Sequence, residues 1–246
     1  MDKPWELKIS SERTTNTLFV FHLFCEDSIC EPLYFKQFEN NIKVITHHGQ
    51  KSMFKNLIKT IKKCKDDGFL KKTDAGYKLV HEGMEIWCVF DRDKGANGEN
   101  IEEGNIEFDL AINTAIGQGI NIAWSNDAFE IWILLHLMEI PVRDYEIAKD
   151  REYYYSKLKE YFQNHSSPNI DLQKALQHSF GYKYSLKSEQ NFKNIVLTEI
   201  IPNVSIAVER SKILAQNCVT ENDFSKKAPC TNVYKLVERI LEEQTK

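Results

Sequence analysis

The segment MEIWCVFDRD, residues 84–93, combines an apolar run of strand type with two aspartates separated by one residue. Side chains alternate between the two faces of a strand, so residues two apart point the same way. We therefore expect Asp91 and Asp93 to converge on one point. Adjacent carboxylates repel each other unless a cation lies between them, and Mg²⁺ is commonly bound by one or two carboxylates together with substrate phosphates. The pair thus predicts a divalent metal at the end of a buried strand.

Other segments also have the composition of buried strands, and helical patterns separate them. The predicted strands are 17–25, 42–47, 84–91 and 120–124, and the predicted helices begin near Glu31, cover 51–65 and 106–117, and begin again at Asp127. This alternation predicts an open, mainly parallel α/β sheet of Rossmann-like type with helices on both faces. Ligands of such sheets bind at the carboxyl ends of the strands. Glu26 directly follows the first strand, and Ser125 and Asn126 follow the fourth.

The sequence beyond Pro141 differs in character, because strand-like runs disappear. Helical patterns cover 145–162, 172–178, 191–200, 204–217 and 231–243. We predict a helical appendage packed on the α/β part. The predicted divisions are an N-terminal extension, 1–15, an α/β domain, 16–140, and a helical C-terminal region, 141–246.

The composition is that of a soluble globular chain, with 42% hydrophobic and 28% charged residues among 246. It excludes wholesale disorder and a fibrous repeat. The net charge of -4 argues against a protein that coats nucleic acid through bulk charge. A local basic face or metal-bridged phosphates can still carry such binding.

The cysteines and the apolar runs bear on location. The six cysteines form no C-x-x-C pair and have no zinc-ligand spacing, which favours reduced thiols in a cytosolic protein. Residues 1–16 lack the apolar core of a signal peptide, and the longest apolar runs are far shorter than the roughly 20 residues that a membrane helix needs. We therefore expect a cytoplasmic protein that does not bind a membrane.

Glu26 strengthens the metal hypothesis, because it is a third carboxylate at the end of a different strand of the same sheet. Three carboxylates at one sheet edge are costly without a cation. We predict Glu26, Asp91 and Asp93 as catalytic and metal-binding residues for Mg²⁺ or Mn²⁺. Glu31 is either a further ligand or an acid that favours the start of a helix. A lone D-x-D also occurs in nucleotide-sugar glycosyltransferases and in aspartyl-phosphate phosphatases, and two aspartates can simply cap a turn.

Four auxiliary candidates near the same edge each have two interpretations. Ser125 and Asn126 either join the site or only terminate the strand. Asp127 and Glu130 form a capping-box pattern, so Glu130 either closes that box or serves the site. For His136, a hydrogen-bonded core histidine is favoured over a site residue.

Two lysine-containing surfaces are candidates for contacts with nucleic acid. The lysines of segment 51–65 lie outside its apolar face, where an ordinary solvated surface is favoured over a phosphate-binding ridge. The segments REYYYSKLKEYF and GYKYSLK interleave tyrosines with lysines, a combination that can stack on bases and bind phosphates. Amphipathic packing explains the first segment equally well. The candidate contacts are Lys55, Lys59, Lys62, Lys63, Lys183 and Tyr184.

Three motifs carry a resemblance to a known family. FCEDSICEPLYF (24–35) resembles the strand, Glu-Gly and Thr-Glu-Pro opening of Toprim domains of the RloB-like family. WCVFDRD (87–93) resembles that family's third-strand D-x-D, and WSNDAFEIWILLH (124–136) is similar to its Ser-Asn-Pro-x-Phe-Glu-x-Trp segment. APCTNVYKLV (228–237) is similar to the weaker closing motif. The first three motifs fall in the family's order over residues 16–140.

The chain departs from the family pattern at three positions. Asp27 stands where the family has glycine, Cys30 where it has threonine, and Asp127 where it has proline. The acidic residues of the motifs are all retained, which does not suggest an inactive copy. Aspartate tolerates turns well, so the first turn can still form.

The resemblance implies a Toprim-like catalytic domain at 16–140 and an Mg²⁺-dependent nuclease that cleaves phosphodiester bonds, with RNA, including tRNA, favoured over DNA. It also implies an effector of anti-phage defence, acting by abortive infection, beside an ABC-type or AAA-type ATPase partner. Two alternatives stay open. One is a catalytically silent subunit that binds such an ATPase or a nucleic acid; the other is a D-x-D glycosyltransferase, which leaves Glu26 without a role. The sequence does not predict an oligomeric state.

Overall fold

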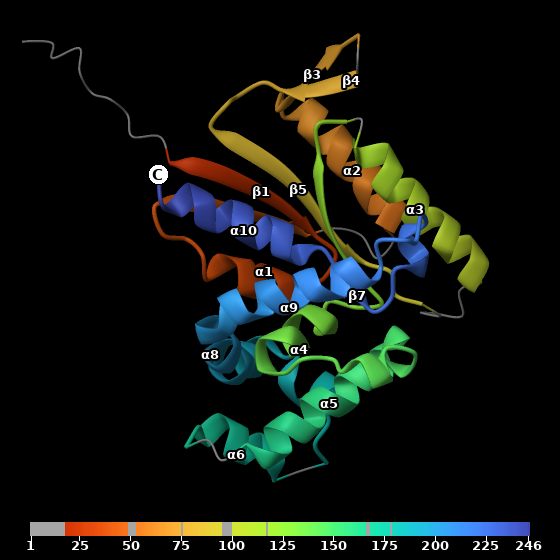
Figure 1. The fold of residues 1–246 in the computed structure, drawn as a ribbon. Helices are drawn as coiled ribbons and strands as arrows, with labels where there is room; N and C mark the ends of the chain where they lie inside the picture. Colours follow the sequence, from red (N-terminus) through yellow and green to blue (C-terminus); the bar gives the residue numbers. More distant parts are fainter. Residues whose placement is uncertain are drawn as a thin grey trace, which may run out of the picture.

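A mainly parallel sheet lies at the centre of the fold (Figure 1). The computed structural model describes residues 18–48, 53–74, 76–94, 100–116, 118–165, 168–177 and 179–246. Over this range the sheet has five strands, in the order β2-β1-β5-β6-β7. The strands are β1 (Phe19–Cys25), β2 (Ile42–His48), β5 (Met84–Asp91), β6 (Asn121–Asn126) and β7 (Cys230–Thr231). The first four are mutually parallel, which confirms the predicted α/β class. The predicted extension, 1–15, lies outside the described residues.

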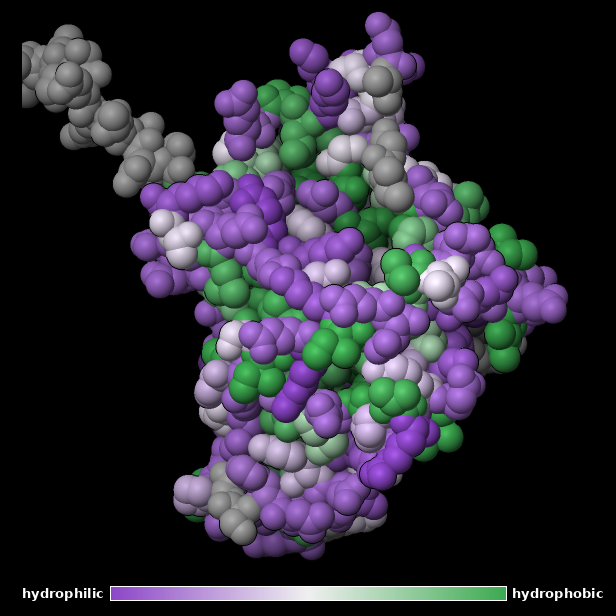
Figure 2. All heavy atoms as spheres, in the orientation of Figure 1, coloured by the Kyte–Doolittle hydropathy of each residue, from purple (hydrophilic) through white to green (hydrophobic). Residues whose placement is uncertain are grey.

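Helices cover both faces of the sheet (Figure 1). The helices of the α/β part are α1 (Cys30–Lys36), α2 (Met53–Asp66), α3 (Ile101–Ile116) and α4 (Glu130–Leu137). Those of the C-terminal part are α5 (Arg151–Asn164), α6 (Ile170–Leu176), α7 (Glu189–Asn191), α8 (Leu197–Ile200), α9 (Val204–Asn217) and α10 (Val233–Gln244). Hydrophilic side chains cover much of the face shown in Figure 2, with hydrophobic ones between them.

The alternation of side chains along β1 divides the buried interior into two layers. Phe21 and Leu23 belong to a cluster that includes residues of α1, α4, α5, α9 and α10. Phe24 points to the other face and belongs to a cluster with residues of α2 and α3. Because both faces are buried, the strand is a continuous apolar run, as expected for a parallel sheet.

The strand β7 corrects the prediction that strands end before residue 141. It pairs antiparallel with β6, with Thr231 opposite Ser125 and Cys230 opposite Asn126. The predicted helix 231–243 therefore begins later, with α10 at Val233. A two-residue strand is too short to show a period in the sequence. The first buried cluster runs from Phe21 of β1 to residues of α10, so the C-terminal region shares its core with the sheet.

A second correction concerns the segment between α2 and β5, which the sequence suggests is a polar connector. It contains a two-stranded antiparallel hairpin, β3 (Leu70–Thr73) and β4 (Gly76–Leu79). Most of its residues are partly or fully exposed, and lysines occupy several strand positions. Such short polar strands lack the apolar alternation that marks a strand in sequence.

Two helices, α3 and α5, begin at residues other than those predicted. α3 begins at Ile101 rather than at residue 106. α5 begins at Arg151 rather than at residue 145, because the Asp150 side chain accepts a hydrogen bond from the N–H of Glu152 and caps the helix. This boundary places Arg151 at the start of the helix. Of the helices in the described part of the chain, none is long and apolar enough to cross a membrane.

The side chain of Asn232 holds the C-terminal segment on the edge of the sheet at β6. It accepts a hydrogen bond from the N–H of Trp124 and donates one of 3.2 Å to the carbonyl of Ile122. Asn232→Ala leaves these groups of β6 without partners, so we expect the free energy of unfolding to fall by about 2 kcal/mol. Urea denaturation measures this loss. Thr220→Ala, at an exposed position, serves as the control. An equal, small effect of both substitutions would show that the Asn232 hydrogen bonds do not hold the C-terminal segment on β6.

Candidate functional site

The carboxyl ends of β1 and β5 bring two of the predicted acids together. Glu26 directly follows β1, and its N–H donates a hydrogen bond of 3.1 Å to the carbonyl of Val89. Asp91 is the last residue of β5, and its N–H donates to Glu26 Oε2 at 3.1 Å. The parallel pairing of these strands, with Cys25 opposite Val89, produces this contact. Glu26 and Asp91 therefore meet at the sheet edge where the sequence places them.

The first turn of α1 adds a third carboxylate, Glu31, which is completely buried. Glu31 Oε2 accepts a hydrogen bond of 3.2 Å from the N–H of Asp27. Asp27 in turn accepts hydrogen bonds from the N–H groups of Ile29 and Cys30 through Oδ1. Asp27 thus stabilises the turn that follows β1, and this turn directs Glu31 back toward the end of β1.

Glu26, Glu31 and Asp91 form what we call the central triad, and within the described residues none of the three has an ion pair. Burial, followed by the charges of Asp93 and Asp27, raises the pKa of Glu26 to about 8. Burial first, and the neighbouring carboxylates second, raise the pKa of Glu31 and of Asp91 well above their ordinary values. The triad therefore favours either bound protons or a cation.

Among the buried oxygens of the central triad, Asp91 Oδ1 and Glu31 Oε1 have no hydrogen-bond partner in the described structure. The other oxygen of Asp91, Oδ2, accepts a hydrogen bond of 2.8 Å from the N–H of Phe129. Buried polar atoms are usually paired, and carboxylate oxygens are the ligands that Mg²⁺ and Mn²⁺ prefer. In the type of donor atom, these residues fit such a cation. Across the part of the chain that the structure describes, however, no three His, Cys, Asp or Glu side chains are arranged so that they could hold a metal ion.

Asp93 lies beyond the end of the strand, although its charge has the largest effect of any neighbouring charge on the pKa of Asp91. Strand β5 ends at Asp91, and Asp93 has a φ of 53°, so the alternation of strand side chains does not extend to it. The N–H of Asp93 donates to the carbonyl of Asp127 at 2.9 Å, and its carboxylate forms an ion pair with Arg151. The negative charge of Asp93 still raises the pKa of Glu26. Asp93 is therefore near the central triad but is held by a protein cation.

Arg151, the first residue of α5, binds two aspartates at once. Besides its ion pair with Asp93, it donates from Nε and Nη2 to the two carboxylate oxygens of Asp127, each at 2.9 Å. Asp127 also accepts a hydrogen bond from the N–H of Lys94. The capping-box prediction is therefore wrong: α4 has no side-chain cap, and Asp127 pairs with Arg151.

Lys187 forms the second flanking ion pair. Its Nζ lies 2.7 Å from Glu130 Oε1 and 3.9 Å from Asp27 Oδ2. Burial opposes the charge on Lys187, but the charge of Glu130 outweighs it, so the pKa of this ammonium lies above its ordinary value. Seven carboxylates thus gather at this edge, and two cations form ion pairs with four of them. The remaining three are the central triad.

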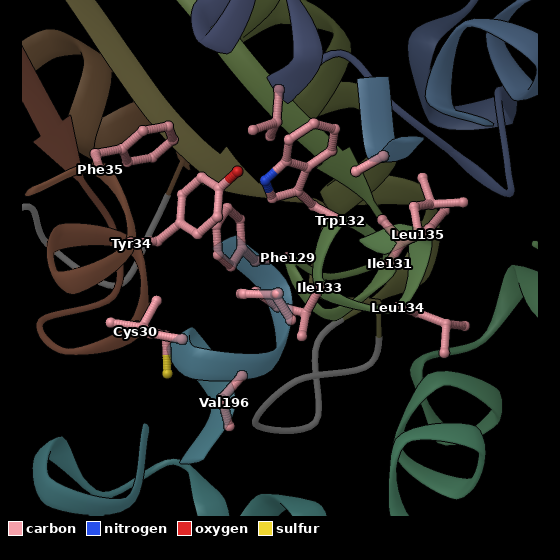
Figure 3. Close-up of a cluster of buried hydrophobic side chains, with 14 of the residues drawn as sticks. Cys30, Tyr34, Phe35, Phe129, Ile131, Trp132, Ile133, Leu134, Leu135 and Val196 are labelled. Carbon is pink, nitrogen blue, oxygen red and sulfur yellow. The ribbon is translucent and has the colours of Figure 1, made fainter. Parts of the chain in front are cut away.

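The side chains of the other auxiliary candidates form their hydrogen bonds with partners other than the carboxylates. The Ser125 hydroxyl lies 3.1 Å from that of Thr231, and the Asn126 amide donates to the carbonyls of Phe224 and Ser225. These two residues anchor the C-terminal segment. His136 is a buried core histidine, with Nε2 3.0 Å from the Tyr34 hydroxyl and Nδ1 2.8 Å from the carbonyl of Trp132. Burial lowers the pKa of His136 to about 4. Figure 3 shows the apolar cluster in which Tyr34 and Trp132 lie.

The lysine candidates divide between two regions. Lys59, Lys62 and Lys63 are exposed on α2, and Lys63 forms a salt bridge of 2.8 Å with Asp67, as expected of a solvated helix face. The side chain of Lys55 lies outside the described residues. Lys183 and Tyr184 lie in the C-terminal part, with Tyr184 largely exposed. The sequence does not identify Arg151 or Lys187 as site residues, although both lie within the two tyrosine- and lysine-containing segments.

The Arg151 ion pairs predict a loss of stability when the cation is removed. Arg151→Ala leaves Asp93 and the buried Asp127 without a positive partner, so we expect the free energy of unfolding to fall by about 2–3 kcal/mol. Urea denaturation provides the measurement. Arg143→Ala, which removes an 85% exposed arginine, is the control and should have little effect. Equal effects of the two substitutions would contradict the assignment.

The raised pKa of Glu26 predicts a pH dependence of stability in metal-free protein. The folded state holds the proton on Glu26 more tightly than the unfolded state, with a pKa of about 8 against an ordinary 4.5. The stabilisation is therefore fully present below the unfolded pKa and is lost as the pH rises through the folded one. Glu26→Gln cannot ionise, so its urea midpoint should exceed that of the wild type at about pH 9 but not at about pH 4. If the urea midpoints of the two proteins changed with pH in the same way, this prediction would be contradicted. As a control, Glu209→Gln, at an exposed position, should have the same urea midpoints as the wild type at both pH values.

A family model described as RloB-like protein matches residues 21–240, nearly the whole chain. No curated protein and no solved structure matches it. The matched range includes every carboxylate of the site and both flanking cations. The protein therefore belongs to the RloB-like family.

Proposed function

We propose that the protein is an Mg²⁺- or Mn²⁺-dependent nuclease of Toprim type. The observation that supports the proposal best is the pair of orphaned carboxylate oxygens, Asp91 Oδ1 and Glu31 Oε1, in a buried triad without an ion pair in the described structure. Leaving three such carboxylates uncompensated is costly, and a divalent cation removes this cost. The site also lies at the carboxyl ends of parallel strands, where α/β sheets bind their ligands.

In this proposal Asp91 and Glu31 hold the cation, Asp93 joins them when it is released from Arg151, and Glu26 binds it or a second ion. The bound cation would stabilise negative charge on the attacking and leaving oxygens of a phosphodiester. Glu26 would take a proton from the attacking water. A carboxylate beside that water can accept its proton as a general base. Arg151 would then be free to contact a phosphate oxygen.

The biological setting is proposed from the family to which the chain belongs. RNA, including tRNA, is favoured as the substrate over DNA, and the activity would serve defence against phage in the cytoplasm. An ABC-type or AAA-type ATPase is the proposed partner. A catalytically silent interaction subunit is the second candidate, and the ion pair of Arg151 with Asp93 favours it, because that ion pair occupies one of the predicted ligands.

The experiment that tests the proposal measures metal binding and cleavage separately. Calorimetric titration with Mg²⁺ and Mn²⁺ should show binding to the wild type and to Glu209→Gln, an exposed carboxylate away from the site, but much weaker binding to Asp91→Asn. Incubation with tRNA and with DNA should show metal-dependent cleavage that Glu26→Gln and Asp91→Asn reduce by about 100-fold or more.

Metal binding, cleavage and thermal stability together decide between the candidate functions. Absence of metal binding by the wild type would overturn the nuclease and favour the interaction subunit. Cleavage that Glu26→Gln and Asp91→Asn leave unchanged would remove the site from the mechanism. Stabilisation of the wild type against heat by a nucleotide diphosphate sugar, without cleavage, would instead support a glycosyltransferase.

A further inference from the structure

A surface pocket of about 280 Å³ lies beside the chain segment that leads to Lys187, one of the two flanking cations. It lies between α5 and the start of the π-helical segment Tyr182–Leu186, which ends immediately before Lys187. Its lining residues are Glu152, Tyr155, Ser156, Lys159, Gly181, Tyr182, Lys183 and Tyr184. The four α5 residues recur at intervals of three and four, so they form one face of the helix.

The pocket has an aromatic wall and a positively charged rim. The rings of Tyr155 and Tyr182 stack, with centroids 6.2 Å apart and an interplanar angle of 24°. Lys159 and Lys183 both line the pocket and outnumber its one carboxylate, Glu152. Stacked rings together with ammonium groups suit a ligand that has both a flat surface and a negative charge.

Tyr184 presents a large aromatic ring to solvent. It is 85% exposed, and the Nζ of Lys183 lies 6.0 Å from its ring centroid. Because so little of the ring packs against the protein, its flat faces are available to a ligand. Exposed aromatic rings next to lysines are the platforms on which single-stranded nucleic acids stack their bases.

A second, independent observation points to a ligand. Tyr182 is almost completely buried, yet its hydroxyl has no hydrogen-bond partner in the described structure. Buried tyrosine hydroxyls usually have such a partner. Tyr182 also lines the pocket, so its wall contains a hydroxyl donor that no protein acceptor uses in the described structure.

We propose that this pocket binds an unpaired nucleotide that flanks the bond to be cleaved. The base stacks on Tyr184, Lys159 and Lys183 contact the neighbouring phosphates, and the Tyr182 hydroxyl donates to an oxygen of the same strand. This inference rests on the proposed nuclease function and adds a substrate class to it: single-stranded RNA or loops rather than duplexes. A base in a duplex is already stacked and paired, so it cannot place its face on Tyr184.

The test measures binding of full-length protein to a fluorescent single-stranded RNA oligonucleotide and to the matching duplex by anisotropy, in EDTA so that no cleavage occurs. The wild type should bind the single strand more tightly. Tyr184→Ala should weaken this binding about tenfold, whereas Tyr184→Phe, which keeps the ring, should bind like the wild type. Lys183→Ala should weaken binding and reduce its dependence on salt. The controls are Lys193→Ala and Val142→Ala, two exposed positions outside the pocket, which should change nothing.

Thermal unfolding separates binding from folding, because the exposed Tyr184 contributes little to stability and its variants should melt like the wild type. Equal affinity of the wild type for duplex and single strand, or unchanged binding by Tyr184→Ala, would overturn the inference and leave metal binding at the carboxylates untouched. No binding of RNA by the wild type would also overturn it. The metal titration described above then decides separately whether the proposed nuclease stands.

Discussion

Repulsion among seven carboxylates at one sheet edge is the constraint on which this structure depends. Two cations from the C-terminal region, Arg151 and Lys187, each form ion pairs with two of these acids, and the central triad has no ion pair within the described residues. The sheet topology alone therefore produces a site of high negative charge, and the helices packed on it decide how much of that charge remains. The remaining charge is what a divalent ion would neutralise.

The parts of the fold that could be predicted are those with a continuous local signal. β1, β2, β5 and β6 are apolar runs followed by helical patterns, so both the parallel sheet and the meeting of Glu26 with Asp91 followed from the sequence. β7 and the β3–β4 hairpin could not be predicted, because they are too short or too polar to show a period.

The ion pairs were unpredictable for a different reason. Arg151 and Lys187 reach carboxylates that lie tens of residues away in the sequence, and no local spacing links them. The capping-box pattern of Asp127 and Glu130 was misleading for the same reason, since both side chains pair with these distant cations. The direction of the Asp93 side chain could not be predicted from strand alternation, because β5 ends at Asp91 and Asp93 has a positive φ.

The position of Arg151 and Lys187 in the C-terminal region restricts which sequence changes the chain tolerates. Both belong to the region after residue 141, whereas the acids that they bind belong to the sheet and its first helices. A helical region transplanted from another protein would have to supply an arginine and a lysine at the same two points, or the sheet edge would repel itself. The two halves are therefore expected to change together, with charge balance rather than packing alone deciding which combinations fold.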